Sequence, residues 1–220
     1  EELKKELPSL KVATLVTNNY EDFLNIQEEL LDSNVDILIT TSLFARSIAI
    51  DNIGLIAVVN IDSISKMADY DATYRAYSTL LYNKKILEEY PEAIQIIQTY
   101  NPNDGYINDY LTGNYHDYIK NEIVTRKILK NEPFYYVNRI IVKGKYETIF
   151  KEAHEIKQEI TNQYNREVFI MGPTYNYQCA GVQLIIKHKI NNISDFYQIL
   201  YQKYQTTNTT LLIDKYPKYL

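Results

Sequence analysis

Basic side chains in the second half of this sequence have the type and spacing that contact with phosphate groups requires. Lysine and arginine displace the counterions of a nucleic-acid backbone when they bind it. The candidates for such contact are Arg126, Lys127, Arg139, Lys143 and Lys187. Alternation along a strand would place Arg139 and Lys143 on one face. A solvated sheet edge explains these cations about as well as DNA does, so both interpretations stay open.

Two tyrosines could add a second kind of contact, because an aromatic ring can stack on an unpaired base. Tyr175 and Tyr177 lie in the stretch 174–183, which contains no lysine or arginine. The chain has 22 tyrosines and no tryptophan, and its many Asn, Ile and Lys residues are typical of an AT-rich genome. Ordinary packing or surface exposure is the simpler interpretation of this pair.

Metal and thiol chemistry are not expected. Cys179 is the single cysteine, so neither a disulfide nor a zinc site built on cysteines can form within one chain. The three histidines, His116, His154 and His188, are not at metal-ligand spacing, and no histidine–acid pattern accompanies Cys179. We expect no metal site and a reducing, cytoplasmic setting.

Length and charge bound the class of protein. The 220 residues suffice for one large domain or two ordinary ones, and 45% of them are hydrophobic. The net charge of −5 is unusual for a dedicated nucleic-acid binder, so a local basic patch or another part of the protein would have to supply the contact. No uninterrupted apolar run of about 18 residues occurs, so we expect no membrane span. Because the chain opens at Glu1 without Met, we expect a fragment.

The first half alternates short apolar runs with amphipathic stretches, which favours a parallel sheet covered by helices. The expected strands are 11–17, 35–40, 55–60 and 93–99, and the expected helices are 20–32 and 70–89. A turn cluster at 101–105 ends this part. A helical stretch at 106–130, broken near Gly113 and closed by Pro133, follows it.

The second half has a different order of predicted strands and helices. It contains, in order, strand 135–143, helix 147–163, strand 167–171, strand 182–188, helix 193–204 and strand 209–214. This β-α-β-β-α-β order predicts a ferredoxin-like domain.

Three stretches, in this order and spacing, resemble the primosomal protein N′ (PriA) family of bacterial replication-restart helicases. The first runs from 38 to 77, where Thr41, Ala45 and Asn52 stand at positions at which the family has the same residues. The second is IIQTYNP at 96–102, nearly identical to the family's strand after its last helicase motif. The third covers 122–173 and is similar to the family's linker helix and C-terminal domain.

The resemblance implies an α/β fold in three parts. Residues 1–103 would form a RecA-like second helicase lobe, 104–132 a helical linker, and 133–220 a ferredoxin-like C-terminal domain of DNA-binding type. It implies a role in DNA replication restart or initiation. The implied partners are forked or single-stranded DNA, other primosome proteins and single-stranded-DNA-binding protein, with no membrane. ATP and Mg²⁺ would serve a full-length active protein, and neither is expected in this fragment.

The resemblance also identifies where a helicase lobe would carry its catalytic groups. Thr41 lies in the family's Gly-Thr-Gln loop, and Arg46 replaces a family lysine. The family's arginine-rich motif corresponds to 82–89, which has Lys84 and Lys85 but no arginine. Lysine cannot make the forked contact of an arginine finger with a γ-phosphate. We assign no catalytic residue and expect no ATP hydrolysis by this chain alone.

Two alternatives remain. One is a motor-dead, non-enzymatic replisome interaction module derived from the same family. The other is an unrelated two-domain α/β protein whose ferredoxin-like domain binds a small molecule. The match at 96–102 counts against the second.

Overall fold

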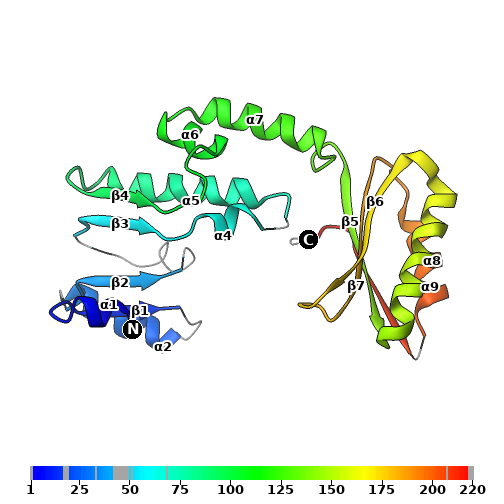
Figure 1. Ribbon diagram of the computed structural model, residues 1–220, viewed down its shortest axis with the longest axis horizontal. Helices are drawn as coiled ribbons and strands as arrows, with labels where there is room; N and C mark the ends of the chain where they lie inside the picture. The colour runs from blue at the N-terminus through cyan, green and yellow to red at the C-terminus, as the bar shows by residue number, and fades with distance from the viewer. Residues whose placement is uncertain are drawn as a thin grey trace. The chain divides into compact units, whose positions relative to one another are not determined.

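The computed structural model describes residues 2–16, 20–32, 34–41, 50, 52–67, 69–206 and 208–217. The chain divides into two compact units. The first consists of Glu1–Ile61 and Ala76–Tyr100, and the second of Asp62–Arg75 and Asn101–Leu220. Each unit has its own secondary structure, and Figure 1 labels the elements.

The first unit contains two β-α-β arrangements with parallel strands. A short helix, α1 (Glu2–Glu6), precedes β1 (Val12–Leu15), which pairs with β2 (Ile37–Thr40) after the intervening helix α2 (Tyr20–Leu31). β3 (Leu55–Val58) pairs with β4 (Ile94–Ile97). Between them in the sequence come α4 (Asp62–Ser65), which belongs to the second unit, and α5 (Ala72–Leu87), which belongs to the first unit from Ala76 onward. Parallel pairing with helical crossovers is what the alternating sequence pattern predicts.

The parallel strands are less buried and less connected than their sequences predict. Among the described residues they form two separate two-stranded sheets, not one continuous sheet. Strands β3 and β4 each alternate between exposed and half-buried residues. Leu55 on β3 and Ile94 and Ile96 on β4 remain exposed. An uninterrupted apolar run predicts burial on both faces, and that part of the prediction is wrong for these strands.

Two helices open the later part of the second unit. α6 (Gly105–Leu111) and α7 (Tyr115–Ile128) are separated at Gly113, whose φ of +72° lies in the left-handed region that glycine tolerates best. Asn114 then caps α7, because its side chain accepts a hydrogen bond from the backbone N–H of Asp117 at 3.2 Å. The predicted helical break is confirmed, and its cause is this turn and cap.

A four-stranded antiparallel sheet forms the rest of the second unit. Its elements are β5 (Tyr136–Gly144), α8 (Tyr146–Tyr164), a 3₁₀ turn (Asn165–Glu167), β6 (Val168–Asn176), β7 (Gly181–His188), α9 (Ser194–Tyr204) and β8 (Thr209–Asp214). The strands lie in the order β6-β7-β5-β8, and every neighbouring pair is antiparallel. Helices α8 and α9 both pack on one face of this sheet (Figure 1). The predicted β-α-β-β-α-β order of elements is confirmed.

The main hydrophobic core lies between that sheet and its two helices. The fully buried side chains include Ile140 on β5, Leu184 and Ile186 on β7, Ile156 on α8 and Leu200 on α9. Burying a side chain of this size contributes about 1.5–3 kcal/mol. Strands β5 and β7 are central in the sheet, so they carry most of the strand contribution to this core.

Strand β6 is longer than the sequence predicts. We expected it to end at Met171, but it continues to Asn176 across a register irregularity between Met171 and Thr174. Pro173 falls in this irregularity, where it has no N–H to donate, and β6 is an edge strand. A proline therefore interrupts the ladder without ending the strand, because one side of an edge strand needs no partner.

Candidate nucleic-acid interface

Arg126, a candidate for DNA contact, lies in the last turn of α7 and is engaged by two carboxylates. Its Nη2 donates to Oδ1 of Asp71 at 2.6 Å, and its Nε donates to Oε1 of Glu122 at 2.7 Å. The Arg126 side chain is only 16% exposed. Its guanidinium carbon also lies 5.6 Å from the centre of the Tyr70 ring, within cation–π range. Internal carboxylates therefore offset its charge, and the contacts hold α7 against the residues that precede α5.

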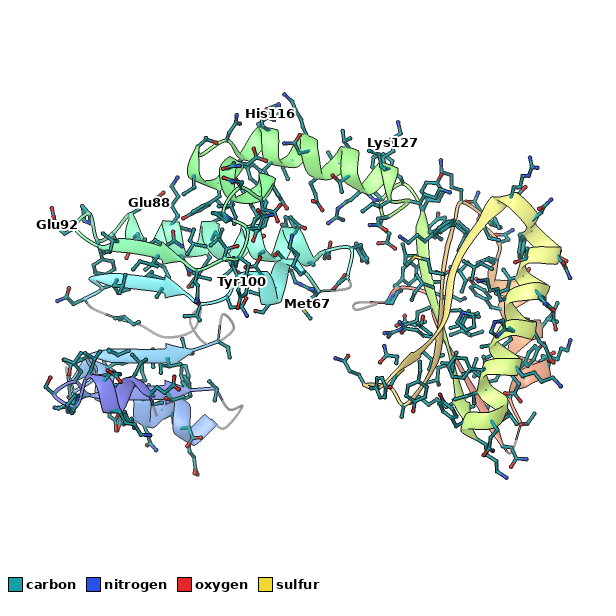
Figure 2. All side chains as sticks on the ribbon, viewed as in Figure 1. Met67, Glu88, Glu92, Tyr100, His116 and Lys127 are labelled. Carbon is teal, nitrogen blue, oxygen red and sulfur yellow. The ribbon has the colours of Figure 1, made fainter. Side chains whose placement is uncertain are left out.

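Lys127, the next residue, has the opposite environment. It is exposed, and its side chain points away from α7 into solvent (Figure 2). Of the two adjacent cations on this helix, Lys127 is the one whose charge is available to a phosphate group.

Arg139 and Lys143 lie on the face of β5 opposite the two helices. They alternate with Ile140 and Val142, which are completely buried in the core between sheet and helices. Because Ile140 and Val142 face the core, Arg139 and Lys143 both project from the other face of the strand, as predicted. Nη2 of Arg139 donates to Oδ2 of Asp214 on β8 at 3.3 Å.

Lys187 is an interior residue of β7 and not a surface cation. Its residue exposure is 8%, and Nζ donates to the backbone oxygen of Leu129 at 2.9 Å and to Oδ1 of Asn131 at 2.7 Å. Burial lowers the pKa of the Lys187 ammonium, and the nearby charge of Lys130 lowers it further. The side chain thus links β7 to the segment between α7 and β5.

The two candidate tyrosines lie together at the β6–β7 hairpin. Their ring centres are 5.0 Å apart with the planes at 73°, an edge-to-face contact. Tyr175 is half-buried and packs against the domain core, whereas Tyr177 is 88% exposed. Sequence reasoning missed two neighbours. Tyr146 lies 5.8 Å from Tyr175, and Phe150 lies 5.7 Å from Tyr146. The available signal was the i, i+4 aromatic pair at the start of a helix.

The positions taken from helicase motifs lie far from these cations in sequence. Thr41 follows β2 and is exposed, while Arg46 lies outside the described residues. Lys84 and Lys85 are exposed in the last turn of α5. Their placement on a helix end leaves the ammonium groups near solvent.

A buried polar network lies beneath the sheet on the helix side. The backbone N–H of Ile190 donates to Nδ1 of His188 at 3.1 Å, so Nε2 carries the proton and donates to Oδ1 of Asn138 at 2.6 Å. The hydroxyl of Tyr197 donates to the same oxygen at 2.9 Å. Burial lowers the pKa of His188 and raises that of Tyr197. Each of these groups is therefore held neutral inside the domain.

Neither a metal-binding cluster nor a membrane-spanning helix occurs in the described part of the chain. No group of three or more His, Cys, Asp or Glu side chains there could hold a metal ion. No described helix combines the length and the apolar character that crossing a membrane requires.

The fold and these surfaces define a mixed α/β protein that combines short parallel sheets with an antiparallel four-stranded sheet. No family model matches the chain. Curated relatives do match it, and all of them carry one description, replication restart protein PriA.

Three of these relatives give the extent of the similarity. The Thermotoga maritima protein is 26% identical over 155 residues, which cover 69% of this chain and 21% of the relative. The Borreliella burgdorferi protein is 27% identical over 228 residues, covering 98% of this chain and 34% of the relative. The Bacillus subtilis protein is 26% identical over 208 residues, covering 86% and 25% respectively.

The chain is thus a divergent sequence similar to the C-terminal region of PriA-type replication restart proteins. It spans between 21% and 34% of the length of these three relatives. The resemblance expected from the motifs at 38–77, 96–102 and 122–173 is confirmed.

Proposed function

We propose that this chain is the C-terminal part of a PriA-like replication-restart protein. In this proposal residues 1–103 form the second RecA-like helicase lobe, 104–132 the helical linker, and 133–220 a ferredoxin-like domain that contacts DNA. The observation that carries it is the match to the Borreliella burgdorferi protein, because that similarity extends over 98% of the chain and so includes both units. The parallel β-α-β pairs and the four-stranded antiparallel sheet support a parallel part followed by an antiparallel part. Residues 62–75, which the proposal assigns to the lobe, group with the second compact unit.

The partner of the C-terminal part would be forked or single-stranded DNA. Lys127 and Lys143 support this proposal, because neither forms an ion pair with a carboxylate among the described residues, whereas Arg126 and Arg139 each do. Because only Lys127 and Lys143 remain of the five candidate cations, on a chain of net charge −5, we infer weak binding that other parts of the full-length protein strengthen. Other primosome proteins and single-stranded-DNA-binding protein are the further partners that we propose.

ATP and Mg²⁺ belong to the full-length protein in this proposal. A first lobe would supply the phosphate cradle and the acidic residue that holds Mg²⁺. On this chain, Lys84 and Lys85 stand where family members have arginines, at the exposed end of α5. They can supply positive charge to a γ-phosphate but not the forked geometry of a guanidinium. We therefore infer that the chain alone does not hydrolyse ATP.

The experiment that tests the proposal uses the full-length protein from which this chain derives. ATP hydrolysis is measured with and without a forked DNA, and the double variant Lys84→Ala/Lys85→Ala is compared with Lys127→Ala. We expect forked DNA to stimulate hydrolysis. The double variant should lower the rate at saturating DNA, whereas Lys127→Ala should raise the DNA concentration needed for half-stimulation. A full-length protein that forked DNA does not stimulate would contradict the helicase role and leave the interaction-module alternative.

A further inference from the structure

A row of aromatic rings crosses one end of the four-stranded domain, and three of its members are tyrosines. Tyr146 is the first residue of α8, Tyr175 lies near the end of β6, and Tyr177 directly follows β6. The Tyr146 and Tyr175 ring centres are 5.8 Å apart, and those of Tyr175 and Tyr177 are 5.0 Å apart. We call these three residues the tyrosine ladder. Phe150 lies behind Tyr146, with ring centres 5.7 Å apart.

The ladder is anchored in the middle and open at both ends. Tyr175 is half-buried and packs against the domain core, and this packing holds its ring in position. Tyr146 is 66% exposed and Tyr177 is 88% exposed, although both rings contact Tyr175. Exposed aromatic rings that are held by a neighbour packed against the core lose little conformational freedom on binding, which favours their use as a contact surface.

The charged side chains considered at this end of the domain are two lysines and one glutamate. Lys145 immediately precedes Tyr146 and is exposed. Lys143 lies at the same end of the domain, because its Cγ is only 3.0 Å from where a side chain on Gly181, in the β6–β7 hairpin, would begin, but it projects from the sheet face opposite Tyr175. Glu147 is the acidic residue next to Tyr146 in the sequence. Two ammonium groups against one carboxylate suit a polyanion better than they suit a neutral or cationic partner.

We propose that the tyrosine ladder stacks on unpaired bases of single-stranded DNA, while Lys145 contacts the adjoining phosphates and Lys143 contacts phosphates where the strand passes round the β6–β7 hairpin. Each base has an aromatic face, so a stacking surface accepts a strand of any sequence. A duplex hides those faces between neighbouring base pairs, so the ladder distinguishes single strands from duplex. The inference rests on the proposed function and assigns its single-strand contact to one surface.

The absence of tryptophan from the chain permits a direct test, because one introduced tryptophan is then the only one present. In the Tyr177→Trp variant of the 220-residue chain, we expect oligothymidine to quench the tryptophan fluorescence. A blunt duplex and an uncharged apolar peptide should leave it unchanged. The matched reporter is Tyr216→Trp, because Tyr216 is 75% exposed in the same unit but lies outside the ladder. Its fluorescence should not respond to oligothymidine.

Affinity measurements on variants separate stacking from other contacts. Tyr146→Ala and Tyr177→Ala should each weaken oligothymidine binding about 5- to 150-fold, since one base stack contributes on the order of 1–3 kcal/mol. Tyr177→Phe should retain the affinity and Tyr177→Leu should lose it, which a merely apolar contact would not do. Tyr216→Ala is the control, and Glu147→Gln should strengthen binding.

The outcomes distinguish this inference from the proposed function. Suppose that the chain binds oligothymidine, the Tyr177→Trp reporter is not quenched and the alanine variants bind normally. The stacking role of the tyrosine ladder is then wrong, and DNA binding by the chain stands. If the peptide quenches that reporter and oligothymidine does not, the ladder is a protein-docking surface and the inference is overturned. If no DNA binds at all while the variants remain folded, autonomous DNA contact by this chain fails together with the ladder.

Discussion

The ion pairs of Arg126 give the sharpest prediction about stability. Replacing Arg126 with alanine removes a guanidinium that donates to Asp71 at 2.6 Å and to Glu122 at 2.7 Å. The Glu122 side chain is 12% exposed and would be left buried without its cation, whereas Asp71 is 38% exposed and can be rehydrated. Breaking a buried pair costs roughly 3–5 kcal/mol, and exposed pairs contribute at most about 1 kcal/mol. We expect Arg126→Ala to lower the free energy of unfolding by about 2–4 kcal/mol.

The assay is urea unfolding of the 220-residue chain followed by circular dichroism. Arg126→Lys keeps a charge but loses the fork, so it should be intermediate between the wild type and Arg126→Ala. Lys127→Ala changes the adjacent exposed residue and should stay within about 0.5 kcal/mol of the wild type. If Arg126→Ala and Lys127→Ala were equally stable, the guanidinium would not be paired in solution, and Arg126 would return as a DNA-contact residue.

Three further predictions follow from buried groups and tight contacts. Burial lowers the pKa of His188, so on acidification the unfolded chain binds a proton at a higher pH than the folded chain does. The stability that neutral His188 contributes is therefore complete above its unfolded pKa of about 6.5, and it is lost as the pH falls towards the folded pKa. Urea unfolding at a series of pH values should show a weaker acid dependence in His188→Gln than in the wild type, and parallel curves would contradict this. Lys187→Met should destabilise the chain by about 1–3 kcal/mol in the same assay, since it leaves the oxygens of Leu129 and Asn131 without their hydrogen-bond donor. An unchanged urea midpoint would show that water replaces the ammonium group. Gly181→Ala would place a Cβ 2.9 Å from both a side-chain carbon of Ile141 and the backbone oxygen of Val142. The thermal midpoint of unfolding should therefore fall by an amount equivalent to about 1–3 kcal/mol. Gly105→Ala is the control and should not lower the midpoint, because nothing lies within 4 Å of its added Cβ.

The second half of the fold could be predicted from the sequence because its signals are strong and local. The apolar pattern of β7 predicts a buried strand, and Gly181–His188 is buried at nearly every position. Strand 209–214 has the bounds that were predicted. The helix α8 presents its apolar residues Ile149, Ile156 and Ile160 to one side, which periodicity alone identifies.

The parallel part was predicted less well because its strands are short. Each of the four strands has only four residues, so an apolar run of that length does not reveal how many faces are covered. The extension of β6 was missed for a different reason. Gly172 and Pro173 are usual turn residues, and only the pairing of Thr174 with Gln183 shows that the strand resumes beyond them.

The candidate site depended on contacts that no local pattern contains. Arg126 and Asp71 are 55 residues apart in the sequence, and Lys187 and Asn131 are 56 apart. A list of basic residues therefore could not separate the cations used inside the fold from Lys127, which points into solvent. The aromatic contact of Tyr146 with Tyr175 likewise forms only when α8 packs against β6.

Salt-dependent binding of forked DNA tests the central claim most directly. Labelled forked DNA is titrated with the 220-residue chain at about 50 mM and about 200 mM salt. Contact with roughly three phosphates would give a slope near −2 in a plot of log affinity against log salt, so the affinity should fall about 20-fold between the two conditions. Binding that is absent at both salt concentrations, or that does not change with salt, would contradict DNA contact by this chain.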